Sequence, residues 1–256
     1  MDRPYLIRIS SHKGGVGKTT IAANLATALQ LMGKRVFVID ADIANPSLGF
    51  HFGLDQANIG YFEVLHGKAQ LRNAIAVHAP TGLHILPGTL HSRISLPTKQ
   101  EVRKLANQLK RQKYDYIIVD TPPGFFQEEV TKVYDEALIV ATPEMSAVSS
   151  SIKLASTYER GKLKHSLVVN KVSGKRYELS IEEIEDAYGD KALAALPDDE
   201  TVPMSIAAHI PAYLYKPRCP FSKAVKELAR RYAARTGELG EEEHRQGFWA
   251  RLFGLQ

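Results

Sequence analysis

"SHKGGVGKTT", residues 11–20, stands between an apolar run, YLIRIS at 5–10, and a helical stretch that begins at residue 19 and ends near Gly33. A glycine-rich loop between a strand and a helix suits phosphate, because the loop N–H groups and the positive end of the helix dipole face the anion. We therefore expect a strand–loop–helix unit that binds the phosphates of a nucleotide. A glycine-rich turn that binds no ligand is the alternative.

The loop supplies both backbone donors and functional side chains. Lys18 is expected to reach the β- and γ-phosphate oxygens, the Thr19 hydroxyl to ligate Mg²⁺, and Thr20 to bond the α-phosphate. The strict phosphate-loop pattern has glycine six residues before the lysine, and this chain has His12 there. The N–H groups expected to wrap the phosphates belong to Gly14, Gly15, Val16 and Gly17.

The rest of the chain alternates apolar, β-rich runs with amphipathic stretches and shows no internal repeat. Near-continuous apolar strands separated by helices are typical of a parallel sheet that is covered on both faces. We predict an α/β protein with the three-layer P-loop NTPase fold, in which helices flank a mostly parallel, twisted sheet. Further strands are expected at 35–40, 83–88, 114–124, 136–142, 165–171 and 191–199, and further helices at 99–112, 146–161, 180–190 and 222–235.

The composition sets limits on partners and location. The 256 residues carry a formal charge of +5, which favours anionic partners such as nucleotide, nucleic acid or acidic lipid without choosing among them. The single cysteine, Cys219, excludes an internal disulfide framework and argues against an iron–sulfur cluster. Because no apolar stretch approaches the roughly 18 residues of a membrane span and no secretory signal is evident, we expect a cytoplasmic protein.

The stretch KGGVGKTT at 13–20 resembles the deviant Walker A signature of the MinD/ParA family of ATPases. The resemblance implies hydrolysis of ATP with Mg²⁺ by an ATP-dependent homodimer. It also implies that Lys13 crosses the dimer interface to the phosphates bound by the other subunit, where a fixed cation lowers the barrier to phosphoryl transfer. Hydrolysis would then wait for dimerisation. A solvated loop lysine is the alternative for Lys13.

Three aspartates follow apolar strands at positions that resemble the family's metal and catalytic residues. Asp40 ends one strand and Asp120 ends another, and both carboxylates are suited to hold magnesium through bound water. The resemblance makes Asp42 the residue that orients the attacking water. The alternative is that Asp42 only caps a turn together with Asn45 and Pro46.

Further segments resemble the family in the expected order. Residues 38–54 resemble the first switch region, and DTPPG at 120–124 resembles the second. The resemblance implies that Asn170, near the end of another strand, binds adenine, with a turn-capping asparagine as the alternative. LPDDETVPMSIAAHIP at 196–211 resembles a late loop that packs around the base. The ATPase domain is therefore expected to span residues 1–236.

The end of the chain differs in character from the domain before it. A polar, glycine-punctuated linker is expected at 237–243, followed by an amphipathic tail at 244–256 that resembles the C-terminal membrane-targeting sequence of the family's MinD-type members. A tail helix that docks on its own domain or on a partner protein is the alternative. The apolar residues that fall on one arc of the tail helix are Phe248, Trp249, Leu252, Phe253 and Leu255.

These features predict a MinD-like switch that is cytoplasmic but peripherally and reversibly associated with the membrane. It would recruit or position an unidentified partner protein, for division-site placement or a similar task. The main alternative is a ParA-type partition ATPase that binds DNA nonspecifically through a basic last helix, although such charges often only solvate a helix face. A maturation factor for a metal enzyme is a third possibility, for which no ligand cluster is evident. The basic residues of the last helix are Lys223, Lys226, Arg230, Arg231 and Arg235.

Overall fold

A computed structural model describes residues 3–54, 57–90, 97–124 and 132–235. The described strands are β1 (Tyr5–Ser10), β2 (Val36–Asp40), β3 (Ala76–His78), β4 (Leu83–Leu86), β5 (Tyr116–Asp120), β6 (Glu136–Ala141), β7 (Lys164–Val172) and β8 (Ala194–Pro197). The helices are α1 (Lys18–Leu31), α2 (Tyr61–Leu65), α3 (Leu71–Ala74), α4 (Lys99–Lys110), α6 (Met145–Arg160), α7 (Ile181–Tyr188), α8 (Thr201–Ala207), α9 (Ala212–Tyr215) and α10 (Pro220–Arg235), with a 3-10 helix η1 (Leu48–His51). The predicted linker at 237–243 and the predicted tail at 244–256 lie outside the described residues.

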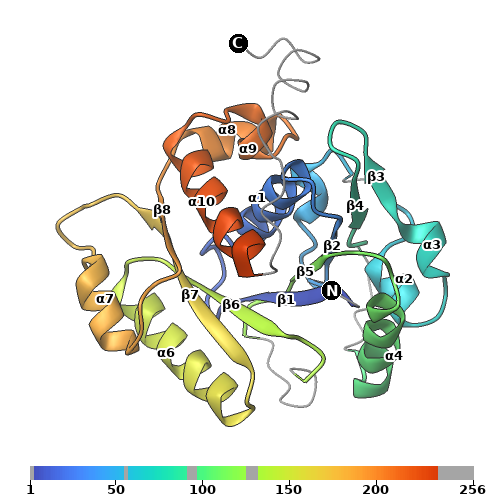
Figure 1. Cartoon of the computed structure of the whole chain (residues 1–256), viewed down its shortest axis with the longest axis horizontal. Helices are drawn as coiled ribbons and strands as arrows, with labels where there is room; N and C mark the ends of the chain where they lie inside the picture. Colours follow the sequence, from blue (N-terminus) through green and yellow to red (C-terminus); the bar gives the residue numbers. More distant parts are fainter. Residues whose placement is uncertain (1–2, 55–56, 91–96, 125–131, 236–256) are drawn as a thin grey trace.

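The described strands form one eight-stranded sheet in the order β3-β4-β2-β5-β1-β6-β7-β8 (Figure 1). β3 pairs antiparallel with β4, and all other neighbouring strands are parallel. β1 lies between β5 and β6, so the loop after it opens at the carboxyl edge of the sheet, where open α/β proteins bind their ligands. The predicted α/β class with a mostly parallel sheet is confirmed.

Alternate residues of each central strand face two helix layers. Ile7 and Ile9 of β1 belong to the core that includes α1, α9 and α10, whereas Leu6 faces the core formed with α2, α3 and α4. α6 and α7 pack on β6 and β7 on the side away from α1 and α10 (Figure 1). This is the three-layer arrangement that the alternation of strands and helices predicted.

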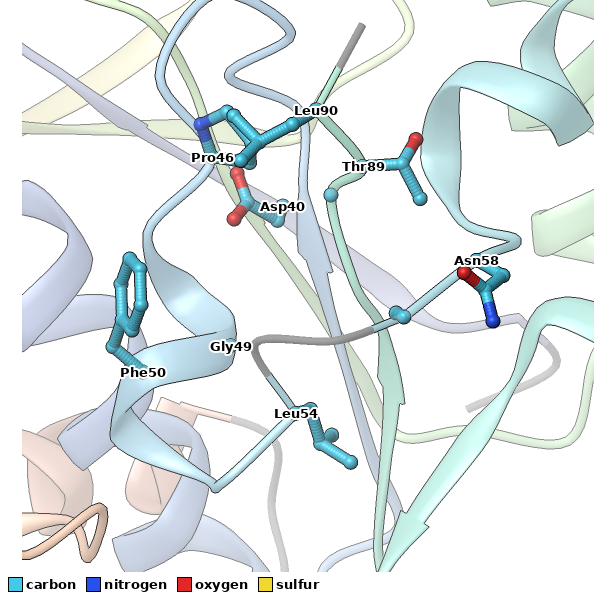
Figure 2. A pocket seen from close by; sticks show the side chains of 10 residues that line it. Asp40, Pro46, Gly49, Phe50, Leu54, Asn58, Thr89 and Leu90 are labelled. Carbon is cyan, nitrogen blue, oxygen red and sulfur yellow. The ribbon is translucent and has the colours of Figure 1, made fainter.

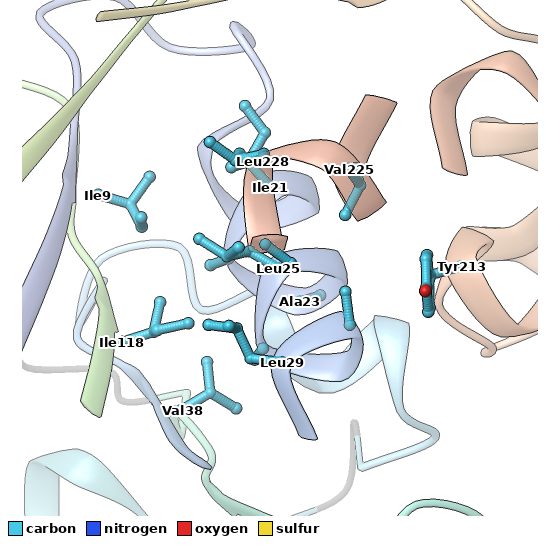
Figure 3. Close-up of a cluster of buried hydrophobic side chains, with 14 of the residues drawn as sticks. Ile9, Ile21, Ala23, Leu25, Leu29, Val38, Ile118, Tyr213, Val225 and Leu228 are labelled. Atoms are coloured by element: carbon cyan, nitrogen blue, oxygen red, sulfur yellow. The ribbon is translucent and has the colours of Figure 1, made fainter. Parts of the chain in front are cut away.

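α1 is buried around most of its circumference, because its many alanines let the sheet and α10 approach closely. In Figure 3, Leu25 and Leu29 of α1 point toward the sheet residues Val38 and Ile118, and all four belong to one buried cluster. Leu228 of α10, drawn beside Ile21 of α1, belongs to the same cluster. A helix held on both sides by close-packed core cannot tilt freely. The phosphate loop therefore ends at a fixed helix N-terminus.

The segment 196–211 differs from the loop that the sequence predicted, because α8 occupies residues 201–207 of it. Asp199 Oδ1 accepts a hydrogen bond from Thr201 N at 2.9 Å, which satisfies one of the free N–H groups at the start of the helix. Pro203 lies in the first turn, where it removes no hydrogen bond that the helix needs. The sequence predicted a loop here because it contains turn-forming residues, which in the structure lie at the start of this short helix.

Arg8 is a positively charged side chain buried on the central strand of the sheet. Arg8 on β1 is 1% exposed, and its Nε donates to Ser10 Oγ at 2.9 Å. Its guanidinium lies 5.7 Å from the ring centre of Tyr134 and 6.0 Å from that of Tyr158. Aromatic faces stabilise a desolvated cation by roughly 2 kcal/mol. The Arg8 side chain thus fills the space between α2–α4 and α6–α7 on its face of the sheet.

Among the described residues, no helix is both long and apolar enough to cross a bilayer.

Candidate active site

The loop between β1 and α1 has the backbone geometry that its glycines predict. Gly15 and Gly17 have φ values of +75° and +97°, a left-handed conformation that glycine adopts at little cost. At Gly17 a Cβ atom would lie 2.2 Å from the Asn170 amide nitrogen, so a larger residue would also collide with β7. The loop is therefore shaped by its own glycines and by the strand beside it.

Lys18 is the lysine of the loop that faces the acidic residues. Its side chain belongs to the first turn of α1 and is only 7% exposed. Burial lowers the pKa of Lys18, while the charges of Asp120 and Asp42 act in the opposite direction. The ammonium group is thus placed beside carboxylates that are themselves buried.

The carboxylates lie at the ends of two neighbouring parallel strands. Asp40 on β2 pairs in register with Asp120 on β5, and each is 1% exposed. Burial, and then the neighbouring Asp120 carboxylate, raise the pKa of Asp40 to about 8. Burial raises the pKa of Asp120 to about 7, although the Thr19 hydroxyl and Lys18 oppose the shift. Two buried acids of like charge form a site that a cation stabilises.

Asp40 also holds the segment that follows it. Its carboxylate accepts hydrogen bonds from Ser47 N and Leu48 N, both at 2.9 Å, and from Asp42 N at 3.2 Å. Backbone N–H donors favour the ionised carboxylate, so they partly offset the effect of burial on the pKa of Asp40. The position of residues 42–48 is therefore tied to the charge state of one side chain.

Thr19 connects α1 to the second strand end. Its hydroxyl donates to Asp120 Oδ2 at 2.6 Å, and Ser47 Oγ lies 3.1 Å from Thr19 Oγ1. Because the single Thr19 proton is used on Asp120, Ser47 is the donor in the second contact. The other oxygen, Asp120 Oδ1, is buried and has no hydrogen-bond partner.

This free oxygen fits a magnesium site of the kind found with nucleotides. Mg²⁺ is usually held there by one or two carboxylates, a hydroxyl, waters and phosphate oxygens. Thr19, Asp40 and Asp120 could hold the ion in that way, as the sequence predicted. Within the described part of the chain, no three His, Cys, Asp or Glu side chains are grouped so that they could hold a metal alone.

The structure places Asp42 beside this cluster and shows it in the role that the sequence gave as the alternative. Asp42 is 9% exposed, and its Oδ1 accepts a hydrogen bond from Asn45 N at 3.0 Å, as a turn-capping aspartate does. Its charge still acts on Lys18 and Asp120. The carboxylate therefore lies near Lys18 and Asp120, and its catalytic role stays a prediction.

Lys13 is not brought to the carboxylates. Its side chain is 40% exposed, and its ammonium group donates to the Ser146 hydroxyl and lies 3.9 Å from Glu144 Oε2 at the start of α6. Asn170, in contrast to Lys13, is directed to the phosphate loop, where its amide nitrogen donates to Val16 O at 2.8 Å. Thr20 follows Thr19 on α1 and is half-buried. The predicted residues thus gather at one sheet edge, with Lys13 directed to α6.

Comparison with known proteins shows which family the chain resembles. A family model described as an AAA domain matches residues 5–169. An ATP-binding protein of Methanocaldococcus jannaschii is 34% identical over 88% of this chain and 86% of its own length. The septum site-determining protein MinD of Synechocystis sp. is 34% identical over 88% of each chain.

This chain belongs to the MinD/ParA family of P-loop ATPases.

Solved structures of the family agree with the fold described above. MinD of Pyrococcus horikoshii, solved with Mg-ADP, is 29% identical, has a TM-score of 0.85 and matches 91% of this chain and 98% of its own. A MinC:MinD complex from Aquifex aeolicus is 29% identical with a TM-score of 0.81, over 93% of this chain and 98% of that one. Like other MinD/ParA members, the chain is an ATP-binding P-loop ATPase, as the loop predicted.

A cavity of about 220 Å³ is lined in part by Asp40 (Figure 2). It lies between the segment around Pro46 and Phe50 and the residues that follow β4, Thr89 and Leu90 among them. Sequence reasoning did not identify this contact, because no local pattern shows which segments meet at a sheet edge.

Gly88 is the residue that lets the two segments meet. A Cβ atom at Gly88 would lie 2.3 Å from Pro46 Cβ and 3.1 Å from Asp40 Cγ. The segment after Asp40 can therefore hold its position only while residue 88 has no side chain.

We expect Gly88→Ala to lower the free energy of unfolding by about 1–3 kcal/mol, the usual effect of overpacking. It should also weaken ADP binding, because Asp40 must move away from the added methyl group. Leu90→Ala, two residues along the same segment, is the matched control, since Leu90 is 77% exposed and should change neither property. Chemical denaturation and calorimetric titration with ADP measure the two effects. Equal behaviour of the two variants would contradict the close contact.

Proposed function

We propose that this chain is a MinD-like switch that dimerises with ATP, binds the membrane through its C-terminal tail and recruits a partner protein. The observation that carries the proposal is a phosphate loop with two lysines, of which Lys18 faces a buried carboxylate cluster and Lys13 does not. The names of the relatives, septum site-determining proteins, favour division-site placement or a similar spatial task. A MinD solved with MinC supports a protein partner of that kind.

The chemistry follows from charges that the chain already holds at the sheet edge. Lys18 and Mg²⁺ would neutralise the charge that develops on the transferred phosphoryl group, with Thr19, Asp40 and Asp120 holding the ion. The backbone N–H groups of the loop hold the phosphates in place. Asp42 would orient the attacking water, a task that requires it to leave Asn45 N or to use its second oxygen.

Lys13 would act on the phosphates of the other subunit. Its contacts with Ser146 and Glu144 are at the surface, where ion pairs stabilise a protein by only about 0–1 kcal/mol. Exchange of these contacts for the phosphates of a partner subunit is therefore inexpensive. Hydrolysis that needs a partner's lysine waits for the dimer, which links turnover to assembly.

The tail would make the membrane attachment depend on the dimer. Burial of a large apolar side chain gives roughly 1.5–3 kcal/mol, and ordering each tail residue costs roughly 1–2 kcal/mol. Since these contributions nearly cancel over the ten residues of GFWARLFGLQ, one tail binds weakly. Two tails on one dimer gain roughly 10²–10⁴ in avidity, because the second insertion is intramolecular.

The DNA-binding alternative has less support from α10. Arg230 and Arg231 lie 3.9 Å and 3.7 Å from the carboxylate oxygens of Glu227, and Arg231 also donates to Leu193 O at 2.6 Å. Arg231 is thus already engaged within the chain, whereas Arg230 makes only a long ion pair at the surface. A stripe that binds phosphate nonspecifically works best with free cations.

The role of Asp42 is tested by Asp42→Asn, which keeps an oxygen to accept from Asn45 N but removes the charge. We expect ADP affinity within about threefold of the wild type and ATP turnover lower by about 10²–10⁴-fold, the usual range for a group that assists proton transfer. Asp186→Asn, an exposed carboxylate on α7, is the control. Phosphate release under multiple turnover gives the rate. Unchanged turnover would exclude Asp42 as the water-positioning residue.

Membrane attachment is tested by sedimentation with vesicles that contain anionic phospholipid. We expect the full chain to pellet with ATP and Mg²⁺ but not with ADP, and a chain that ends at residue 243 to stay in the supernatant. Light scattering without lipid should show that the shortened chain still forms an ATP-dependent dimer. A shortened chain that pellets normally would remove the tail from the proposal. ATP-dependent retention on duplex DNA, with none on lipid, would favour the partition ATPase.

A further inference from the structure

β7 has an irregular backbone where it passes the phosphate loop. Its pairing with β8 shifts register between Val169 and Val172. Within that interval Lys171 has a φ of +59°, a left-handed conformation that is unfavourable for a residue with a side chain. Bulges of this kind occur beside active sites, where they redirect a side chain. The strained conformation therefore calls for a reason in the surroundings of Lys171.

The irregularity directs two successive side chains to the same loop. In a regular strand, neighbouring side chains point to opposite faces of the sheet. Here Asn170 Nδ2 donates to Val16 O at 2.8 Å, and Lys171 Nζ donates to Gly15 O at 2.9 Å. Two consecutive residues of β7 thus hold two consecutive carbonyl groups of the phosphate loop.

Each of these carbonyls belongs to a peptide group whose N–H is a predicted phosphate donor. A trans peptide is planar, and its N–H points opposite to its C=O. With Gly15 O turned to Lys171, the N–H of Val16 points away from β7, toward the side of the loop where phosphate is expected. Asn170 fixes the next peptide in the same way and so orients the N–H of Gly17.

We propose that Lys171 is a positioning residue that fixes the Gly15–Val16 peptide and so prepares the loop for phosphate before nucleotide arrives. A cation on the carbonyl oxygen also polarises the peptide and strengthens its N–H as a donor. Preorganisation of this kind raises affinity, because the loop loses less freedom when the ligand binds. The inference concerns nucleotide binding by a single subunit, and it needs neither the dimer nor the membrane.

The chain supplies a matched control in Lys162. This residue follows α6 and is also an exposed lysine with a left-handed φ, of +55°, and its backbone N–H donates to Glu159 O. Among the residues that the structure describes, it makes no hydrogen bond or ion pair with the phosphate loop. Glycine at either position relieves the backbone conformation and removes the ammonium group. Only at position 171 should that change affect nucleotide.

The test is calorimetric titration of the full chain with ADP and Mg²⁺, combined with thermal unfolding of the nucleotide-free protein. We expect Lys171→Met and Lys171→Gly to bind ADP roughly three- to tenfold more weakly, the effect of one net hydrogen bond. Lys171→Arg should restore most of the affinity. Lys162→Gly should bind like the wild type, and both glycine variants should unfold at or above the wild-type midpoint.

Two results would overturn the proposal. Unchanged or tighter ADP binding by Lys171→Met would show that the lysine does not prepare the loop. Binding by Lys171→Arg as weak as that by Lys171→Met would show that a cation at the Gly15 carbonyl is not what matters. If Lys171→Gly unfolds at a lower temperature but binds ADP normally, the proposal is likewise overturned, because Lys171 would then contribute only to stability.

Discussion

The burial of like-charged carboxylates at one edge of the sheet is the constraint on which the site depends. Asp40 and Asp120 are fixed side by side by the register of β2 and β5, and Asp42 adds a third acidic group. Lys18 supplies one positive charge, which is too little for three acids. Burial raises the pKa values of Asp40 and Asp120 because water cannot solvate their charges there. A further cation would offset the remaining negative charge, and this is the role that we propose for Mg²⁺ bound with a nucleotide.

The same carboxylates connect the metal position to the segments expected to respond to nucleotide. Asp40 holds residues 42–48 through their backbone N–H groups, and Gly124 N donates to Ser11 O at the start of the phosphate loop. Both segments that resemble the family's switch regions are therefore in contact with the cluster or with the phosphate loop beside it. α1, in contrast, is held by the core.

Much of the frame could be predicted from local sequence pattern, because the longer strands and helices show regular apolar spacing and the loop residues have recognisable chemistry. The short elements β3, α2, α3, α8 and α9 were not predicted, because so few residues carry no periodic signal. Thr19 could be predicted from the phosphate-loop motif, and Asp40 and Asp120 from their places at the ends of apolar strands together with the family resemblance. The contacts of Lys171, Gly88 and Lys13 could not be predicted in this way. The Lys171 contact depends on a register shift in β7, the Gly88 contact on the approach of two separate segments, and the Lys13 contact on the start of α6. None of these features is encoded by a single stretch of sequence.

The most direct test of the carboxylate cluster as a Mg²⁺–nucleotide site is calorimetric titration of the full chain with ADP, once with Mg²⁺ and once with EDTA. We expect affinity to fall at least about tenfold without the ion, a loss of about 1.4 kcal/mol, because the diphosphate then meets buried acids without the cation between them. Equal affinity in the two buffers would contradict the central role of the cluster.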